Sequence, residues 1–298
     1  MLVPFLNIIQ WKRLLYFSFV LFLFKYCFLY GYGFKTSLTF LDLSILTCSF
    51  SLLFAAGYLF NYRLTKNEKK NKFPVETAKK LALSLSFISL ALGVYLSIKI
   101  EKPLHSFIFA FGIFLTFVYS KTITKKSFLN NLIQSFLIPF AIICLWWFDT
   151  PINLKSAQWD LFYKLELTTI IYAFVSFLSN LVRVLVIDIK DIDKDHYHKH
   201  QTIPILLGRK RAKSVVLAIS IFICFFVFSL AILLTHIKFI SLTIIFLATI
   251  PELYFIYQLL KAKSKSDYKK LHKTTNIVYL LGVLTIPVVA YYFKYVIN

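Results

Sequence analysis

Nine apolar stretches of about 20 residues follow one another along this chain, and they constrain its fold more than any other feature. A helix of roughly 20 apolar residues crosses a hydrocarbon core of ~30 Å, and the mean hydropathy of +0.73 is too high for a soluble globule. We therefore predict an all-α, polytopic membrane protein with about nine transmembrane helices around a central cavity, in one domain over residues 1–298. The stretches lie at 14–33, 38–61, 78–98, 104–120, 128–149, 163–187, 214–235, 238–259 and 275–293.

The basic residues gather in every second loop between these stretches. The formal net charge is +21, and this distribution is the positive-inside pattern of membrane proteins rather than the signature of a nucleic-acid binder. It predicts an integral membrane protein with a cytoplasmic N-terminus and an external C-terminus, and we expect the bacterial inner membrane. The base-rich segments are 12–13, 63–80, 121–126, 190–213 and 261–273.

Four aspartates stand within eight positions where the sixth apolar stretch ends. The whole chain has only 13 acids against 34 lysines and arginines, so this cluster calls for a cation. If the helix continues into the run, Asp188, Asp191 and Asp195 share one face, while Asp193 points away. Such a face suits Mg²⁺, which binds through one or two carboxylates and keeps waters and phosphates as its other ligands.

Other readings of the acidic run are weaker. The spacing from Asp191 resembles the start of a calcium-binding loop, but His196 stands where glycine is required and Thr202 where glutamate is required. His196, His198 and His200 alternate in a way that suits a softer metal, although such trios on solvated loops are usually incidental. An ordinary charged loop is the third alternative, but a cytoplasmic loop is expected to be rich in Lys and Arg. It would therefore not by itself account for the four aspartates.

Two further groups are out of place in apolar sequence. Arg183 precedes the acids inside the apolar run. A cation there needs a partner or an anionic ligand, unless its side chain snorkels so that the guanidinium reaches the membrane interface. Its closeness to the acids favours a shared polar site. Asn130 and Asn131 begin the fifth stretch, and they either face the protein interior or cap a helix.

The run Asp188-Ile-Lys-Asp191-Ile-Asp193-Lys-Asp195, followed by Thr202-Ile-Pro204 and Leu207-Gly208, resembles the second aspartate-rich motif of the UbiA superfamily of intramembrane prenyltransferases. The resemblance is greatest to the branch that is similar to geranylgeranylglyceryl phosphate synthases. Arg183 stands where that branch has its arginine. The segment with Tyr119-Ser120, Lys125 and Asn131 is similar to the family's segment between spans four and five, and Gly57-Tyr58 with Asn61 is similar to the start of its first motif.

The chain departs from the family in that first motif. The resemblance implies aspartates at one, four and eight residues after Asn61, and these places hold Tyr62, Thr65 and Lys69. Val184 and Ile187 also occupy positions that are usually charged in the branch. Three expected metal ligands are therefore missing together, while the second motif is intact.

The resemblance implies transfer of a polyprenyl group from an isoprenyl diphosphate to a small or lipid acceptor within the bilayer. Asp188, Asp191 and Asp195 would be the catalytic residues and would hold Mg²⁺, which neutralises the departing diphosphate. The bases Arg63, Lys66 and Lys69 stand in the first loop and would replace the missing metal ion. The residues implied to bind the diphosphate are Arg183, Lys125, Tyr119, Asn61, Asn131 and Lys69.

Two alternatives remain open at this point. The missing aspartates are also typical of a non-catalytic homologue that binds isoprenoids without turning them over. A small-molecule transporter would share the apolar spans and the positive-inside pattern, but it would explain neither the acids nor Thr202-Ile-Pro204.

Overall fold

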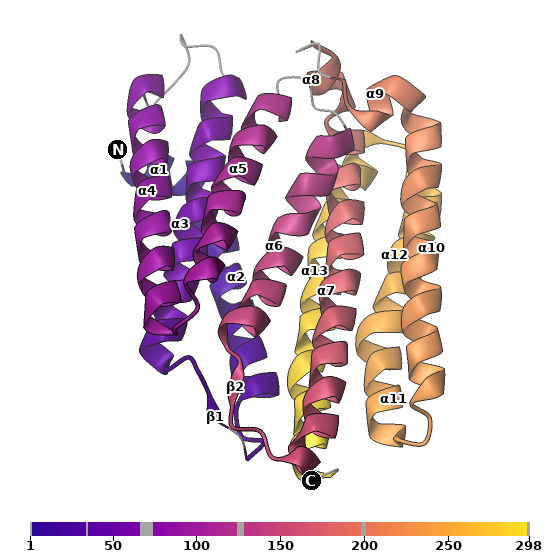
Figure 1. The fold of residues 1–298 in the computed structure, drawn as a ribbon. Helices are drawn as coiled ribbons and strands as arrows, with labels where there is room; N and C mark the ends of the chain where they lie inside the picture. The colour runs from indigo at the N-terminus through magenta and orange to yellow at the C-terminus, as the bar shows by residue number, and fades with distance from the viewer. Residues whose placement is uncertain (1, 34, 66–73, 124–127, 198–200, 297–298) are drawn as a thin grey trace. The chain divides into compact units, whose positions relative to one another are not determined.

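The chain is helical almost throughout (Figure 1). This computed structural model describes residues 2–33, 35–65, 74–123, 128–197 and 201–296. The elements in chain order are α1 (Leu2–Ile8), α2 (Trp11–Phe24), the π-helical η1 (Lys25–Leu29), β1 (Lys35–Thr36), α3 (Phe40–Thr65), α4 (Val75–Lys99), the 3₁₀-helical η3 (Pro103–His105), α5 (Ser106–Ile123), α6 (Phe128–Phe148), β2 (Pro151–Ile152), α7 (Ser156–Lys190), α8 (Ile192–Tyr197), α9 (Ile203–Leu207), α10 (Arg209–Leu233), α11 (Lys238–Ile244), the π-helical η4 (Ile245–Thr249), α12 (Ile250–Lys261) and α13 (Lys265–Tyr295).

Among the described residues, seven helices are long and apolar enough to cross a membrane. The all-α membrane fold is confirmed, whereas the predicted count of nine is not. The first predicted span corresponds to α2, which has 14 residues before the π turn of η1. The fourth corresponds to α5, where the apolar segment found in the described residues is Pro103–Val118.

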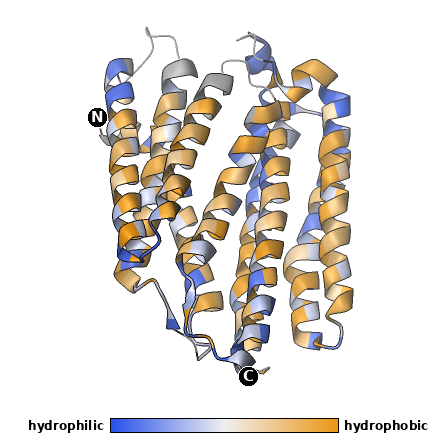
Figure 2. Cartoon of the chain, in the orientation of Figure 1, coloured by the Kyte–Doolittle hydropathy of each residue, from blue (hydrophilic) through white to orange (hydrophobic). Residues whose placement is uncertain are grey.

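The side chains on the helix surfaces agree with a lipid environment. Apolar colours cover the middle of the helices and hydrophilic colours gather toward their ends (Figure 2). Large apolar side chains such as Phe87 on α4 and Phe225 on α10 are more than two-thirds exposed, which a soluble protein would avoid in such number. The protein is thus an integral, multi-pass membrane protein.

The chain divides into two compact units. The first comprises Met1–Thr124 and Phe140–Thr169, and the second comprises Lys125–Pro139 and Ile170–Asn298. Both α6 and α7 contribute to each unit, and α6 changes unit at Pro139, a residue that removes one helical hydrogen bond. The single domain over 1–298 stays a prediction.

Small residues bring helices together in the first unit. Ser49 on α3 and Ser89 on α4 are fully buried and donate hydrogen bonds to each other's carbonyl oxygens, at 2.7 and 2.8 Å. Gly93 on α4 lies directly against the ring of the buried Phe109 on α5. Close backbone approach at small residues is how helices associate in lipid, where the hydrophobic effect no longer drives them together.

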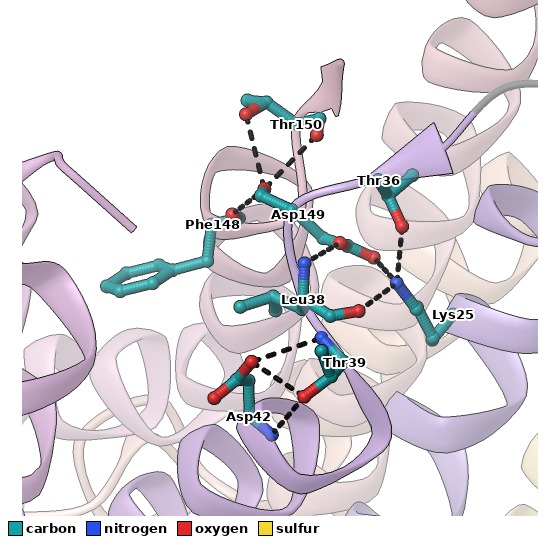
Figure 3. Close-up of polar contacts among 9 residues, drawn as sticks. Lys25, Thr36, Leu38, Thr39, Asp42, Phe148, Asp149 and Thr150 are labelled. Atoms are coloured by element: carbon teal, nitrogen blue, oxygen red, sulfur yellow. Dashed lines mark hydrogen bonds and ion pairs between the residues drawn. The ribbon is translucent and has the colours of Figure 1, made fainter. Parts of the chain in front are cut away.

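A buried ion pair closes one end of the first unit (Figure 3). The Lys25 ammonium pairs with the Asp149 carboxylate and also donates to Leu38 O at 2.9 Å and to Thr36 Oγ1 at 2.5 Å. The second Asp149 oxygen accepts from Leu38 N at 2.8 Å. The pair thereby holds β1 against β2, a two-residue antiparallel pairing that the sequence did not predict.

The second unit is built around one apolar core shared by α7, α10, α12 and α13, with Val186, Val216, Phe255 and Leu271 among its buried members. Its helix ends are closed by side chains. Lys213 donates to Leu260 O and Ala262 O at 2.8 and 2.9 Å, which satisfies carbonyls at the end of α12.

Candidate functional site

The acidic run lies where α7 gives way to α8, within the second unit. α7 extends to Lys190, Asp191 occupies a turn, and α8 begins at Ile192. The helical spacing continues through the turn, because Asp191 N donates to Ile187 O at 2.9 Å and Asp195 N donates to Asp191 O at 3.0 Å. The predicted continuation of the helix into the run therefore holds in the backbone.

The four carboxyl groups differ in burial. Asp188 is 9% exposed and Asp195 is 1% exposed, whereas the Asp193 side chain is 64% exposed. Asp193 pairs loosely with Arg209 at 3.5 Å and with Lys265 at 3.8 Å. Asp191 is intermediate, and its carboxylate lies 3.4 Å from the Lys190 ammonium. Asp193 is thus the solvated member, as the helical register predicts.

Asn131 contacts the acidic run from another helix. It lies in the first turn of α6, is 4% exposed, and donates from Nδ2 to Asp188 Oδ2 at 2.9 Å. This contact decides between the two readings of that amide, because Asn131 faces the interior and lies inside the helix instead of capping it. The hydrogen bond fixes the orientation of the Asp188 carboxyl group.

Arg183 lies on α7 about one and a half turns before Asp188. Its side chain is half-buried. A half-buried cation this far inside a span is the arrangement expected of a functional site.

Thr202-Ile-Pro204 has a structural part to play. Thr202 is buried, and its carbonyl accepts from Ile205 N and Leu206 N, both at 3.0 Å, at the start of α9. Pro204 occupies the first turn, where its missing N–H costs nothing. Gly208 then adopts a φ of 83° between α9 and α10, a conformation that favours glycine. The segment therefore shapes the backbone of α9 and its turn into α10, which follow the acids in the chain.

The predicted metal ligands are not assembled as a closed cage. In the ranges that the structure describes, no group of three or more His, Cys, Asp or Glu side chains is arranged to hold a metal ion. Mg²⁺ does not need one, since one or two carboxylates suffice when water and phosphate complete its octahedron. The two buried carboxyl groups, Asp188 and Asp195, fit this mode because buried acids require compensation by a cation or hydrogen bonds.

Some of the residues predicted from the first motif and from the segment after span four lie outside the described residues. The backbone of Asn61 lies on α3 and that of Tyr119 on α5, but their side chains are not part of the description. Lys69 and Lys125 lie outside the described residues. The Tyr62 side chain packs beside the apolar cluster of Leu59, Ala78 and Ala82, which is consistent with an apolar role where the family pattern has an aspartate.

The sequence interpretation missed several polar residues inside the spans. Ser176 on α7 and Tyr279 on α13 form a hydrogen bond of 2.7 Å, and Glu252 on α12 is only 6% exposed. Glu252 could have been singled out from the sequence, because a lone acid within an apolar stretch indicates a side chain that faces the protein interior. The Ser176–Tyr279 bond joins positions about a hundred residues apart, so no local pattern announces it.

Comparisons with known proteins agree on one family. A model of the UbiA prenyltransferase family matches residues 70–278. The chain is 22% identical to a digeranylgeranylglyceryl phosphate synthase of Methanosphaera stadtmanae over 69% of this chain and 67% of that protein.

Solved structures share the fold at low sequence identity. A structure described as digeranylgeranylglyceryl phosphate synthase has a TM-score of 0.68 at 17% identity, covering 97% of this chain and 98% of that one. A UbiA homologue from Archaeoglobus fulgidus bound to GPP and Mg²⁺ has a TM-score of 0.59 at 12% identity, covering 95% and 99%. A UbiA homologue from Aeropyrum pernix K1 has a TM-score of 0.60 at 16% identity, covering 91% and 98%.

The family match spans more than two-thirds of the chain and includes the whole acidic run. The fold of the solved homologues covers nearly all of it. Together these findings establish that the chain belongs to the UbiA prenyltransferase family.

Proposed function

We propose that the protein transfers a polyprenyl group from an isoprenyl diphosphate to a small or lipid acceptor, with the acidic end of α7 on the cytoplasmic side. The observation that carries this proposal is that two carboxyl groups, Asp188 at the end of α7 and Asp195 on α8, are buried where α7 ends, with Arg183 on α7 five residues before Asp188. Acids and a base at the end of one membrane span are the complementary parts of a metal–diphosphate site.

Asp188, Asp191 and Asp195 would hold Mg²⁺, which supplies the positive charge that stabilises the departing diphosphate. Asn131 orients Asp188 by the hydrogen bond of 2.9 Å, and such an outer contact holds the carboxyl group in place. Asp193 is left for solvent and for Arg209, so it takes no part in the reaction.

Arg183 would bind diphosphate oxygens, which its planar group contacts in pairs. In the reaction the bond between C1 of the prenyl group and the diphosphate oxygen breaks, and C1 bonds to the acceptor nucleophile. The diphosphate keeps the electron pair of the broken bond and takes up the proton that the acceptor loses. Apolar surroundings exclude the water that would otherwise capture the allylic group.

The absence of the first aspartates changes the expected balance of charge. Arg63, Lys66 and Lys69 stand in that loop of the sequence, and we propose that they replace one metal ion as a direct contact to the diphosphate. The related structure bound to GPP and Mg²⁺ supports the same class of donor substrate for this chain.

The test uses purified protein in liposomes with radiolabelled geranylgeranyl diphosphate, Mg²⁺ and geranylgeranylglyceryl phosphate, a lipid chosen from the name of the Methanosphaera relative. The Asp191→Ala variant is expected to lose Mg²⁺-dependent product formation by at least 100-fold, on the order of a lost metal contact. The matched control is Asp193→Asn, which alters the exposed acid two positions away and should retain wild-type turnover.

Unchanged turnover in Asp191→Ala would contradict the assignment of the acidic run. A wild-type protein that binds the diphosphate but forms no product with a pool of hydroxyl-bearing and aromatic acceptors would be a non-catalytic isoprenoid-binding homologue. Either outcome is read from the same set of reactions.

A further inference from the structure

Basic side chains without an acid partner gather at one end of the second unit. Two of them, Lys210 and Arg211, stand at the start of α10, and two more, Lys269 and Lys273, stand near the start of α13. All four are exposed. Within the ranges that the structure describes, none of these four side chains makes an ion pair or a hydrogen bond. Their positive charge is therefore left for something outside the unit.

The helix ends that carry these bases are neighbours in the second unit. Lys213, in the second turn of α10, donates to Leu260 O near the end of α12 at 2.8 Å. Thr274 on α13 donates to Gln258 Oε1 on α12, also at 2.8 Å. The end of α12 thus lies between the starts of α10 and α13, and its last residue is the exposed Lys261. The bases form one continuous edge.

On α10 the bases stand above the face that is suited to lipid. At 100° per residue, Lys210 shares an arc of about 60° with Ile221, Phe225 and Phe228, and the exposed fractions of these three apolar residues run from 44% to 71%. Phe228 lies about 27 Å further along the helix axis, which is nearly the ~30 Å of a hydrocarbon core. The start of α10 is hydrophilic and the helix below it is apolar (Figure 2). Lys210 is therefore placed at the level of the lipid headgroups.

The same arrangement recurs on α13. Lys269 and Lys273 fall within an arc of about 60° with Leu280 and Leu284, which are 43% and 41% exposed. The short helix α9, which packs beside the start of α10 (Figure 1), adds Leu206, an apolar side chain that is 64% exposed. Bases beside exposed apolar side chains are the composition of a surface that contacts the boundary between headgroups and acyl chains.

The orientation signal of the loops does not require this placement. Orientation follows from the excess of Lys and Arg in a loop, whichever way their side chains face. Several bases of this end have partners within the protein instead, since Arg209 and Lys265 lie near Asp193 and Lys213 contacts the end of α12. Asp267 is held in the capping box of α13. The bases that stay without an acid are those above the exposed apolar faces.

We infer that a basic collar, formed by Lys210, Arg211, Lys261, Lys269 and Lys273, binds the phosphate headgroups of anionic membrane lipids. Ammonium and guanidinium groups donate strong, charge-assisted hydrogen bonds to phosphate oxygens. A zwitterionic headgroup would bring a further positive charge among these bases, so a headgroup with net negative charge is favoured. Near an anionic membrane surface each base contributes roughly a fivefold preference. The inference does not depend on the proposed prenyl transfer.

The experiment compares two lipid probes on the purified full chain in phosphatidylcholine liposomes. Spin-labelled phosphatidylglycerol and spin-labelled phosphatidylcholine are added separately, and electron paramagnetic resonance measures the fraction of each that the protein surface immobilises. The wild type is expected to prefer phosphatidylglycerol, and high salt should weaken that preference. The double variant Lys210→Gln with Arg211→Gln should lower the preference about fivefold or more. Lys210→Arg keeps the charge and should retain it.

The matched control is Lys35→Gln with Lys155→Gln, which removes two exposed bases of the first unit and should leave the lipid preference unchanged. Equal immobilisation of both probes by the wild type, or a collar variant with wild-type preference, would overturn the inference. So would a control that loses as much preference as the collar variant, because net charge alone would then explain the effect.

Two further measurements exclude other anions as the ligand. Excess soluble glycerol phosphate should not displace the labelled phosphatidylglycerol, since the collar is inferred to bind headgroups held at the membrane surface; displacement would show a site for free phosphate instead. Binding of geranylgeranyl diphosphate in Mg²⁺ should be the same in the wild type and in the Lys210→Gln, Arg211→Gln variant. Loss of that binding would place the two bases in the donor site and overturn the inference.

Discussion

The aspartates of the acidic run differ in role because a helix ends among them. Asp188 still belongs to α7 and accepts a hydrogen bond from Asn131, while Asp193 is on α8 and faces solvent with Arg209 nearby. Burial separates the candidate ligands from the spare acid more sharply than the motif spacing does, since Asp195 is 1% exposed. Substitutions at neighbouring acids should therefore have very different effects.

Asn131→Ala is expected to weaken Mg²⁺-dependent activity without unfolding the protein. The change removes the hydrogen bond to Asp188, and losing such an outer contact typically costs 10–100-fold in metal affinity or activity. The measurement is the Mg²⁺ concentration that gives half-maximal turnover. Asn276→Ala, at an exposed position of α13, is the control, and equal behaviour of the two variants would contradict the role of Asn131.

The sequence predicted the register of the candidate site's aspartates, but it did not predict the contacts that other helices make with them. The register of Asp188, Asp191 and Asp195 follows from helical spacing alone, so it was predictable. The Asn131–Asp188 contact was not, because it joins two helices that are 57 positions apart in sequence. Ser176 and Tyr279 escaped for the same reason: their pairing depends on which helices are neighbours in space.

Among the helices and strands, the junction of η1, β1, α3 and β2 depends on one ion pair. Lys25 and Asp149 are 4% and 0% exposed at their side chains. A buried ion pair adds little net stability compared with apolar side chains in the same place. Removing one partner, however, leaves the other charge buried and unpaired. The short β1–β2 pairing exists here because these two side chains hold its flanks together (Figure 3).

Lys25→Met is therefore expected to lower the free energy of unfolding by about 3–5 kcal/mol. The double variant Lys25→Met with Asp149→Leu should recover most of that loss, because no unpaired charge remains. Unfolding in detergent mixtures, followed by circular dichroism, measures both. Lys164→Met, from the exposed pair with Asp160, should change little, and a Lys25→Met variant that is as stable as this control would refute the account.

The contact between α4 and α5 offers a second test. A Cβ added at Gly93 would overlap the ring of Phe109, which is 0% exposed and has no space to move. Gly93→Ala should thus cost about 1–3 kcal/mol of unfolding free energy. Gly282→Ala in α13 meets nothing within 4 Å and should be neutral or gain up to ~1 kcal/mol; the reverse order of stabilities would be inconsistent with this packing.

For the whole molecule, hydropathy predicted the class of fold, which the structure confirms, whereas the orientation that loop charge indicates stays a prediction. The number of spans was less predictable, since a run of apolar residues does not reveal where a helix is interrupted. Residues Lys25–Leu29 form a π turn after α2. Apolar residues precede this turn just as they would precede a further turn of α-helix, so the sequence does not mark the interruption. Short pairings such as β1–β2 depend on tertiary contacts that no hydropathy window contains.

The positive-inside pattern predicts that the base-rich segment Lys261–Lys273 faces the cytoplasm and that the C-terminus lies outside. Single cysteines introduced at Ser266 and near Tyr295, in a chain without its four native cysteines, can be labelled with a membrane-impermeant maleimide in intact cells. We expect labelling only near Tyr295. Labelling of Ser266→Cys in intact cells would reverse the orientation and place the acidic run on the external side.

We propose that one acidic cluster, helped by basic side chains, is enough for metal-dependent prenyl transfer. The most direct test is a titration of free Mg²⁺ in the liposome assay of the wild-type protein with geranylgeranyl diphosphate and geranylgeranylglyceryl phosphate. We expect no product in EDTA and a hyperbolic rise of product formation with Mg²⁺ concentration, because one ion completes the site. Product formation that persists in EDTA would contradict it.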